Sequence, residues 1–241
     1  MTVDFIEYSN CGERSVNQDC VGSYSDGEFY VFTLCDGLGG HGGGEIASSA
    51  AVNAIIETAK NRNQYTDLIA SCFENADKSI NQKILENQNL KNMKTTATLL
   101  VFDNGKAQWA HIGDSRIYYF RKNKFVLRTN DHSVPQQLAN MGEIKQSEIR
   151  RHPDRNKLLR CLPYCPNDYE VSEKEVKLSK RDSFVMMSDG FWDWINSKDI
   201  AKSLKKFKTA RESADYLINL AFERGKGNNM DNLSLVIVRI S

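Results

Sequence analysis

The stretch that decides the fold lies at residues 29–42 and reads FYVFTLCDGLGGHG. Its first seven residues are mostly aromatic or aliphatic, which is typical of a buried β-strand. The strand pattern ends at Asp36, and a carboxylate at the end of a buried strand is costly unless another group compensates its charge. The glycines that follow resemble a phosphate-cradling loop, but the Gly-Lys-Ser/Thr of a P-loop is absent. The stretch therefore predicts a strand-to-helix turn with a polar site and argues against a P-loop nucleotide triphosphatase.

Three further aspartates stand beside strand-like runs. Asp114 and Asp189 each follow an apolar run, and Asp231 directly precedes the last one. A single such aspartate is more often part of a turn than of a functional site. Four of them in one chain indicate a shared partner, and carboxylates without Cys or His ligands suit hard cations such as Mg²⁺ or Mn²⁺. Glycine after Asp36 and Asp189 lets the backbone approach closely, so a backbone carbonyl there is a further candidate ligand.

Composition narrows the class of protein. The chain has 241 residues, of which 40% are hydrophobic and 26% charged, as in ordinary soluble domains. Its 32 basic and 31 acidic side chains give a net charge of +1, which argues against nucleic acid as the main ligand but does not exclude a local basic patch. We expect no membrane partner and a cytoplasmic location, because neither a signal-peptide pattern nor a run of about 20 apolar residues is present.

The pattern of strands and helices predicts a layered α+β protein. Eight runs rich in β-branched and aromatic residues are expected to be strands: Glu28–Cys35, Thr95–Phe102, Ala107–Ile112, Arg116–Phe120, Lys124–Arg128, Glu170–Leu178, Ser183–Met187 and Leu233–Ile240. Turn signals at residues 103–106 and 121–123 imply antiparallel hairpins. Helical stripes are expected in Glu45–Ala59, Leu68–Ile84 and Ala214–Ala221. Strand blocks that alternate with helix pairs do not favour a doubly wound parallel sheet.

The six cysteines do not form a tight disulfide framework. Cys161 and Cys165 lack a second Cys or His pair at zinc-ligand spacing, so reduced thiols are expected and a structural zinc is the weaker alternative. No cysteine is followed five residues later by arginine. A phosphatase that uses a cysteine nucleophile is therefore not expected.

Seven short motifs resemble those of the type 2C metal-dependent protein phosphatases and keep the same order along the chain. They are Arg14-Ser15-Val16-Asn17-Gln18-Asp19, Asp36-Gly37-Leu38-Gly39-Gly40-His41, Thr95-Thr96-Ala97-Thr98, Gly113-Asp114-Ser115-Arg116, Asp131-His132-Ser133, Ser188-Asp189-Gly190 and Asp231-Asn232-Leu233-Ser234. The resemblance runs from about residue 8 to 240 and is greatest to the short bacterial members. Several separate motifs in one order make it highly specific.

The resemblance implies a four-layer α+β sandwich of two antiparallel β-sheets flanked by helix pairs, with residues 1–241 forming one catalytic domain. It also implies two Mn²⁺ or Mg²⁺ ions at one edge. Asp36 would bridge the two ions, and the Gly37 carbonyl would complete the first. Asp189 and Asp231 would ligate the second. Asp114, together with Asp189, matches the site where bacterial members hold a weaker third ion.

Two further matches concern catalysis. By the resemblance, Asp19 would orient metal-bound waters and Arg14 would hold the substrate phosphate. A guanidinium suits this role, since its planar fork donates to two phosphoryl oxygens, which lysine cannot copy. The alternative for Arg14 is a surface ion pair with Glu13 or Asp19. Two cations about 4 Å apart can share a water, lower its pKa and present hydroxide in line with phosphorus.

The sequence departs from the family at two positions. Gln18 stands where many members have glutamate, so it can hydrogen-bond a metal-bound water without adding charge. Leu38 stands where others have a histidine that is proposed to protonate the leaving group. His41 lies close by in sequence and is a candidate general acid, although Gly-Gly-His-Gly also suits a simple loop-to-helix turn. A metal-bound water is the alternative acid.

Residues from about 133 to 168 match the mobile flap of bacterial relatives. The stretch includes the basic run at residues 150–157. Such a flap could attract an acidic phosphopeptide, and a solvated surface is the equal alternative. Elsewhere, His111 in an apolar strand is expected to be a buried core residue, and His132 to brace the active-site side of the fold.

The residues and the resemblance together predict hydrolysis of phosphoserine and phosphothreonine in proteins, by direct attack of a metal-activated water. The expected partners are phosphoprotein substrates and, by analogy with the family, a cognate serine/threonine kinase. Two alternatives remain open. One is a catalytically inactive phospho-sensor, against which the intact aspartates count. The other is a metal-dependent hydrolase of small phosphoesters.

Overall fold

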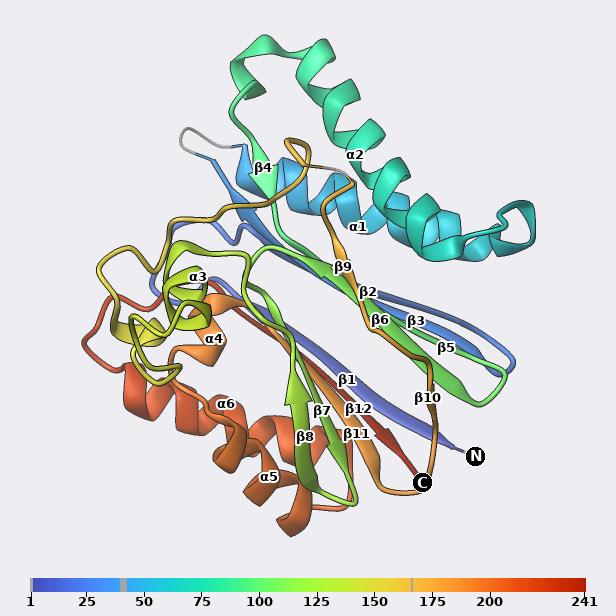
Figure 1. The fold of residues 1–241 in the computed structure, drawn as a ribbon, viewed down its shortest axis with the longest axis vertical. Coiled ribbons are helices and arrows are strands. Elements are labelled where there is room, and N and C mark those ends of the chain that lie inside the picture. Colours follow the sequence, from blue (N-terminus) through green and yellow to red (C-terminus); the bar gives the residue numbers. More distant parts are fainter. Residues whose placement is uncertain (1, 40–42, 166) are drawn as a thin grey trace.

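The computed structural model describes residues 2–39, 43–165 and 167–241. Within these ranges two antiparallel β-sheets pack face to face, and a pair of long helices covers the outer face of each (Figure 1). The predicted four-layer α+β sandwich is therefore confirmed. Within the described ranges, no helix combines the length and the apolar character that crossing a membrane requires.

The first sheet has the strand order β1-β12-β11-β7-β8, and every pair in it is antiparallel. Its strands are β1 (Val3–Asn10), β7 (Arg116–Arg121), β8 (Lys124–Arg128), β11 (Asp182–Met187) and β12 (Leu233–Ile240). The helices that cover it are α5 (Ser197–Lys206) and α6 (Ala210–Gly225), while the short α4 (Asp189–Trp192) follows β11 directly. The first and last strands of the chain thus pair with each other, with β1 at the edge of this sheet.

The second sheet has the order β10-β6-β5-β3-β2. Its strands are β2 (Asp19–Asp26), β3 (Phe29–Leu38), β5 (Ala97–Asp103), β6 (Lys106–Ile112) and β10 (Val176–Lys177), with β4 (Lys94–Thr95) paired to β3 and β9 (Glu170–Val171) paired to β6. The helices on its outer face are α1 (Gly44–Lys60) and α2 (Leu68–Glu86). Short connecting segments are α3 (Val134–Asn140) and single 3₁₀ turns at Arg62–Gln64, Gln88–Leu90 and Ile149–Arg151.

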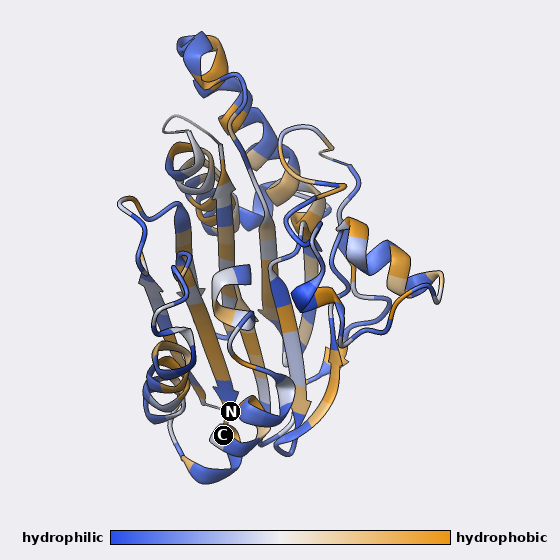
Figure 2. Ribbon diagram, turned by 90° about the vertical axis from the view of Figure 1, so that its left-hand side faces the viewer, coloured by the Kyte–Doolittle hydropathy of each residue, from blue (hydrophilic) through white to orange (hydrophobic). Residues whose placement is uncertain are grey.

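The alternation of side chains along β3 explains why the molecule has layers. Val31 and Cys35 face α1 and α2, whereas Phe32 and Leu34 face the other sheet. This follows from the two-residue period of a strand, and it makes a continuous apolar run bury both faces. Figure 2 shows such strands, largely orange, lying between helices that are partly blue.

The predicted strand at residues 170–178 was wrong, and three elements were missed. The run Glu170–Leu178 forms two separate short strands, because the charged residues 173–175 between β9 and β10 leave the ladder. Strands β1 and β2 and helix α5 were not predicted. The polar residues of β1 and β2 hide the strand period, and α5 is a ten-residue helix in which only Ile200, Ser203 and Leu204 are buried. In α5 the start is fixed by a capping box between Asn196 and Asp199.

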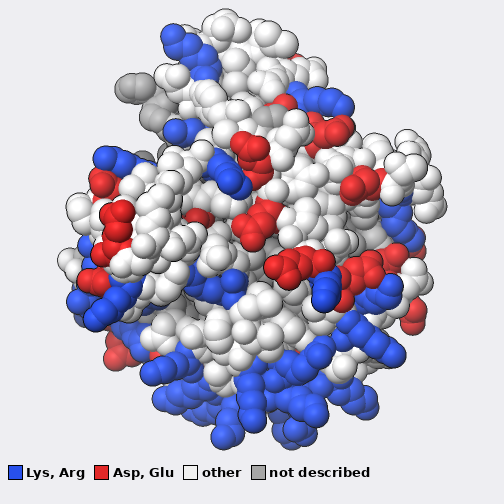
Figure 3. Space-filling view, in the orientation of Figure 1, with Lys and Arg blue, Asp and Glu red and all other residues white. Residues whose placement is uncertain are grey.

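Charge is distributed unevenly despite the net value of +1. Figure 3 shows lysine and arginine side chains gathered at the lower end of the molecule, where α5 and the β7–β8 hairpin lie. The exposed residues there include Lys122, Lys124, Lys202, Lys205 and Lys206. The carboxylates that matter for chemistry lie at the other ends of β7 and β11, described next.

Candidate metal centre

The predicted site residues meet in one cavity of about 520 Å³ at an edge of the sandwich. Its lining includes Arg14, Asp19, Asp36, Gly37, Asp114, Asp189 and Asp231, which are all the predicted site residues that the structure describes. His41, the candidate general acid, lies outside the described residues. Residues far apart in sequence are brought together because β3, β11 and β12 all have a terminus at this edge.

The β2–β3 ladder fixes Asp36. Asp19 and Asp36 are directly opposite in the antiparallel register. The Asp36 backbone N–H donates to the Thr96 hydroxyl at 2.9 Å, and its carbonyl accepts from the Thr96 N–H at 2.9 Å. With its backbone held on both sides, the Asp36 carboxyl group has a defined position in the cavity.

Gly37 permits a close approach of two backbone segments. A Cβ atom at this position would lie 2.0 Å from the Gly44 carbonyl oxygen and 2.6 Å from the Gln18 carbonyl oxygen. The Gly37 N–H donates to that same Gln18 oxygen at 3.0 Å. Only glycine therefore fits between β2 and the start of α1, which keeps the Gly37 backbone at the cavity wall.

Ser188 links Asp19 by hydrogen bonds to strand β12, close to Asp189 and Asp231 in the chain. The Ser188 hydroxyl donates to Asp19 Oδ2 at 2.8 Å and accepts from the Ser234 N–H at 2.9 Å. The other carboxylate oxygen of Asp19, Oδ1, is buried and has no hydrogen-bond partner among the described residues. Burying a carboxylate oxygen without a hydrogen-bond partner costs free energy. The unpaired Oδ1 therefore indicates that a ligand or water binds in the cavity.

Burial and neighbouring carboxyl groups raise the pKa values of the aspartates in the cavity. Burial, followed by the charges of Asp19 and Asp189, raises the pKa of Asp36 well above its usual value. Burial and then Asp189 do the same to the pKa of Asp114. Burial, with Asp231 and Asp193 beside it, raises the pKa of Asp189 to about 7.

The pKa of Asp19 is also raised, to about 6, chiefly by burial. Carboxylates this close cannot all ionise at neutral pH unless a cation compensates them. Such an all-oxygen cluster fits the hard divalent cations Mn²⁺ and Mg²⁺. All the residues that the sequence predicts as metal ligands thus line this one cavity.

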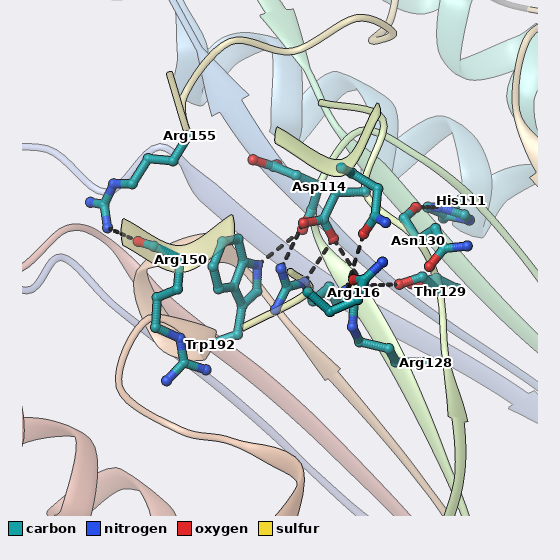
Figure 4. A network of polar contacts seen from close by, with 12 residues as sticks. His111, Asp114, Arg116, Arg128, Thr129, Asn130, Arg150, Arg155 and Trp192 are labelled. Carbon is teal, nitrogen blue, oxygen red and sulfur yellow. Dashed lines mark hydrogen bonds and ion pairs between the residues drawn. The ribbon is translucent and has the colours of Figure 1, made fainter. Parts of the chain in front are cut away.

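A network of polar contacts next to Asp114 fixes the position of its backbone (Figure 4). The Arg116 guanidinium makes a buried, two-pronged ion pair with Asp131 at 2.7 and 2.6 Å, and it lies 3.6 Å over the Trp192 ring. The Trp192 indole N–H donates to the Asp114 carbonyl at 3.0 Å. Arg116 therefore positions the tryptophan that fixes the backbone of Asp114.

The two histidines of this region are structural, as expected. His111 is buried and its Nε2 lies 2.7 Å from the Asn130 carbonyl oxygen. His132 stacks on His111 at 4.5 Å and its Nδ1 accepts from the Gly113 N–H at 3.2 Å. In the neutral tautomer that this bond selects, the His132 Nε2 carries the proton, so the nearby Glu170 carboxylate makes no metal site with it.

Arg14 forms an ion pair, but not with the residues expected as alternatives. Its Nε and Nη2 donate to Asp231 Oδ1 and Oδ2 at 3.0 and 2.9 Å, and both side chains are almost half exposed. The alternative considered for Arg14, an ion pair with Glu13 or Asp19, is not the pair that forms. Arg14 thus lies at the open side of the cavity, in direct contact with a predicted metal ligand.

Three supporting residues were not singled out from the sequence. Asn232 accepts from the Gln18 N–H at 2.8 Å and donates to the Cys11 and Val16 carbonyls at 3.0 Å, so it fixes the loop that carries Arg14. Ser188 orients Asp19 as described above. Glu45 accepts from the Gln18 amide at 3.2 Å. Asn232 and Ser188 stand inside quoted motifs, whereas the signal for Glu45 is only its place in the first turn of α1.

Comparison with known proteins agrees with this geometry. The sequence model of the family described as Protein phosphatase 2C matches residues 7–232. A putative protein phosphatase 2C-type protein of Streptococcus pyogenes is 30% identical over 238 residues, which cover 94% of this chain and 92% of that protein. The serine/threonine protein phosphatase PstP of Mycobacterium tuberculosis is 29% identical over 230 residues, or 94% of this chain but only 43% of PstP.

Solved structures agree as well. A crystal structure of the Mycobacterium tuberculosis phosphatase PstP superposes with a TM-score of 0.83 at 26% identity and full coverage of both chains. The serine/threonine phosphatase of S. agalactiae gives a TM-score of 0.85 at 26% identity, again with full coverage. A structure of the PstP catalytic domain with two manganese ions gives 0.81 at 26% identity and covers 98% of this chain and 97% of that one. This chain belongs to the protein phosphatase 2C family.

Proposed function

We propose that this chain hydrolyses phosphoserine and phosphothreonine in proteins by attack of a metal-activated water. The observation that carries the proposal is the gathering of five aspartates and one arginine in a single open cavity, with buried carboxyl groups that need a cation. The relatives named serine/threonine phosphatases support the choice of substrate class.

The proposed metal ligands are the residues that line the cavity with oxygen atoms. Asp36 would ligate both ions, with the Gly37 carbonyl at one and Asp189 and Asp231 at the other. Asp114 with Asp189 would hold a weaker third ion. Mn²⁺ is proposed ahead of Mg²⁺, because the structure of PstP contains two manganese ions.

Divalent ions held by these residues would lower the pKa of the attacking water and neutralise charge on the phosphoryl group. Arg14 exchanges its two hydrogen bonds from Asp231 to two phosphoryl oxygens of the substrate, for which its fork has the right shape. Asp19, held by Ser188, uses its free Oδ1 to orient the water for attack. No residue of the chain forms a covalent bond to phosphorus.

The leaving group needs a proton. Leu38 lines the cavity where other members have a histidine. His41 is the candidate general acid within the chain, and a metal-bound water is the alternative. Replacing His41 by asparagine separates the two, since loss of an essential acid would flatten the alkaline side of the pH–rate profile.

We also propose that residues 1–241 form one catalytic domain with a flap at about 133–168. The support is that Asn156 and Leu158 of this segment line the metal cavity, and that Arg155 pairs with Asp193 just after α4. Its substrates would then be selected partly by the flap, and a cognate serine/threonine kinase would phosphorylate them. The six free thiols favour the cytoplasm as its location.

One experiment separates the proposal from its two alternatives. Turnover of a phosphothreonine peptide, a phosphoserine peptide and a small aryl phosphate is measured with Mn²⁺, with Mg²⁺ and with chelator. We expect metal-dependent hydrolysis of both peptides. Hydrolysis of the aryl phosphate alone would identify a small-phosphoester hydrolase, and no hydrolysis with intact metal binding would identify a phospho-sensor.

A further inference from the structure

A second cavity, separate from the metal centre, lies between the flap, strands β7 and β8 and the start of α5. Its volume is about 790 Å³. The described residues of its wall include four arginines and one carboxylate: Arg116, Arg128, Arg150, Arg151 and Glu148. The excess of positive side chains distinguishes it from the metal cavity, whose charged lining is mainly acidic.

The arginines around this cavity outnumber the carboxylates that pair with them. The ion pairs are Arg116–Asp131, Arg128–Asp131, Arg155–Asp193 and Arg224–Asp199. Arg150 takes part in none of these pairs and donates to the Ile195 carbonyl at 3.0 Å. Among the described residues, the four arginines of the wall face two carboxylates, Glu148 of the wall and the Asp131 that pairs with Arg116 and Arg128, which leaves two positive charges in excess.

Arg150 is the group that most lacks a partner. Burial lowers the pKa of its guanidinium, and the charge of Arg116 nearby lowers it further. Asp193 and Asp199 are the carboxylates whose charges raise the pKa of Arg150, and both already form ion pairs with other arginines. A partly buried cation without a carboxylate of its own is unfavourable, and an anion in the cavity would relieve it.

Other groups of the wall also suit an oxyanion. Arginine forks donate in pairs to phosphoryl oxygens. Asn196 and Ser197 place the start of the ten-residue helix α5 at the wall, where its dipole adds positive potential. Phe125 and Ile144 provide an apolar surface beside these donors.

The cavity is also connected to the metal centre. Arg116 forms part of its wall, stacks on Trp192, and through the Trp192 indole N–H acts on the Asp114 carbonyl. Figure 4 shows Arg116 and Arg150 on either side of Trp192. An anion here would therefore lie next to the residues that position a proposed metal ligand.

We propose that this cavity is a second anion-binding site, which takes a phosphoryl group outside the metal centre. The phosphoryl group has two available sources: inorganic phosphate, or a second phosphorylated residue of a protein substrate. Binding of inorganic phosphate is independent of the proposed function, whereas the second source rests on it.

Calorimetric titration with inorganic phosphate tests the site without any turnover. The full-length chain carries Arg14→Ala and is kept in chelator, so that neither the arginine nor the ions of the metal centre bind phosphate. Adding Arg150→Gln should weaken phosphate binding about tenfold, the effect of losing a charged hydrogen-bonding pair. The matched control is Arg160→Gln, an exposed flap arginine outside the cavity, which should change binding less than about twofold.

Equal binding by the Arg150 variant and its parent, or equal loss in the Arg160 control, overturns the proposal. Circular dichroism checks that the variants fold. If Arg150→Gln does not fold, Arg151→Gln carries the same prediction, because Arg151 is exposed and lines the same wall.

Kinetics of the metal-loaded enzyme then identify the source. With a substrate source, Arg150→Gln raises KM for a doubly phosphorylated peptide and leaves KM for the singly phosphorylated one unchanged. With inorganic phosphate as the source, both KM values stay the same and product inhibition weakens. No change in any of these three quantities overturns a functional role for the site. If the wild type hydrolyses nothing, the proposed function fails while the calorimetric result still decides the site.

Discussion

Arg14 holds Asp231 through two hydrogen bonds, of 3.0 and 2.9 Å, across 217 positions of sequence. The pair joins the loop before β2 to the residues before β12 at the open side of the metal cavity. The arginine proposed to bind the substrate phosphate and a proposed metal ligand therefore share one contact. If Asp231 coordinates an ion as proposed, the arginine becomes available to substrate.

Arg14→Lys keeps the charge but removes the fork, so it should lower kcat/KM for a phosphothreonine peptide by about tenfold to a hundredfold, mostly through KM. Mn²⁺ affinity, measured by calorimetry, should not fall, because the variant releases Asp231. Steady-state kinetics on peptides provide the test. Unchanged KM would show that Arg14 does not bind the substrate.

Asp36→Asn should abolish turnover and yet stabilise the protein in chelator. The substitution replaces a buried carboxyl group, whose pKa is raised by burial and then by the charges of Asp19 and Asp189, with a neutral amide. Thermal unfolding in chelator should shift up by roughly 5 °C, the change that about 2 kcal/mol produces in a domain of this size. A lower melting temperature in chelator would contradict this account of the cluster.

The stability of the metal-free protein should fall as the pH rises from about 4 to about 7. The pKa values of Asp189 and Asp19 are raised in the fold to about 7 and about 6, from 3.8 for an ordinary aspartate. In this window the unfolded chain has lost the two protons that the folded protein keeps, so each pH unit favours unfolding. The contribution is fully present below about pH 4 and lost above about pH 7.

Melting temperatures in chelator at pH 5 and pH 8 measure this effect. We expect the lower value at pH 8, and recovery there on addition of Mn²⁺, which binds the ionised carboxylates. Asp189→Asn should flatten the profile. A melting temperature that rises between pH 5 and pH 8 in chelator would rule out the raised pKa values.

Gly37→Ala should destabilise the protein by about 3 kcal/mol or more, because the added methyl group would overlap the Gly44 and Gln18 carbonyls. Gly27→Ala is the control. At Gly27 a Cβ meets no atom within 4 Å, and only the positive φ of 63° opposes it, at about 1 kcal/mol. Urea unfolding compares the two, and equal losses would mean that the close approach at Gly37 is not needed.

Asp114→Asn tests the proposed third ion. The variant should bind two Mn²⁺ ions with affinity close to that of the parent, lose any weaker third site, and turn over substrate more slowly. Calorimetry counts the sites and peptide kinetics measures the rate. Loss of the two tighter sites instead would make Asp114 part of the main pair.

Several features of this protein could be predicted from the sequence, because they depend on residues that are neighbours in the chain. The continuous apolar run of β3 predicted a buried strand, which the structure shows to be buried on both faces. The register that places Asp19 opposite Asp36 came from the structure, because strand β2 was not predicted. The order of seven motifs predicted the family and the sandwich of two sheets. The charged residues 173–175, by contrast, divide a predicted strand that composition alone made continuous.

What the sequence by itself determined is which carboxylates are present and that they stand at strand ends, since a two-residue period and an Asp-Gly turn are properties of neighbours in the chain. Only the tertiary structure decided which of these groups meet. The raised pKa values of Asp36 and Asp189, the bond between Arg14 and Asp231, and the unpaired Arg150 arise from residues that are distant in sequence. Burial and Coulomb interactions depend on distance in space, and that distance is set when β12 inserts beside β1 and β11.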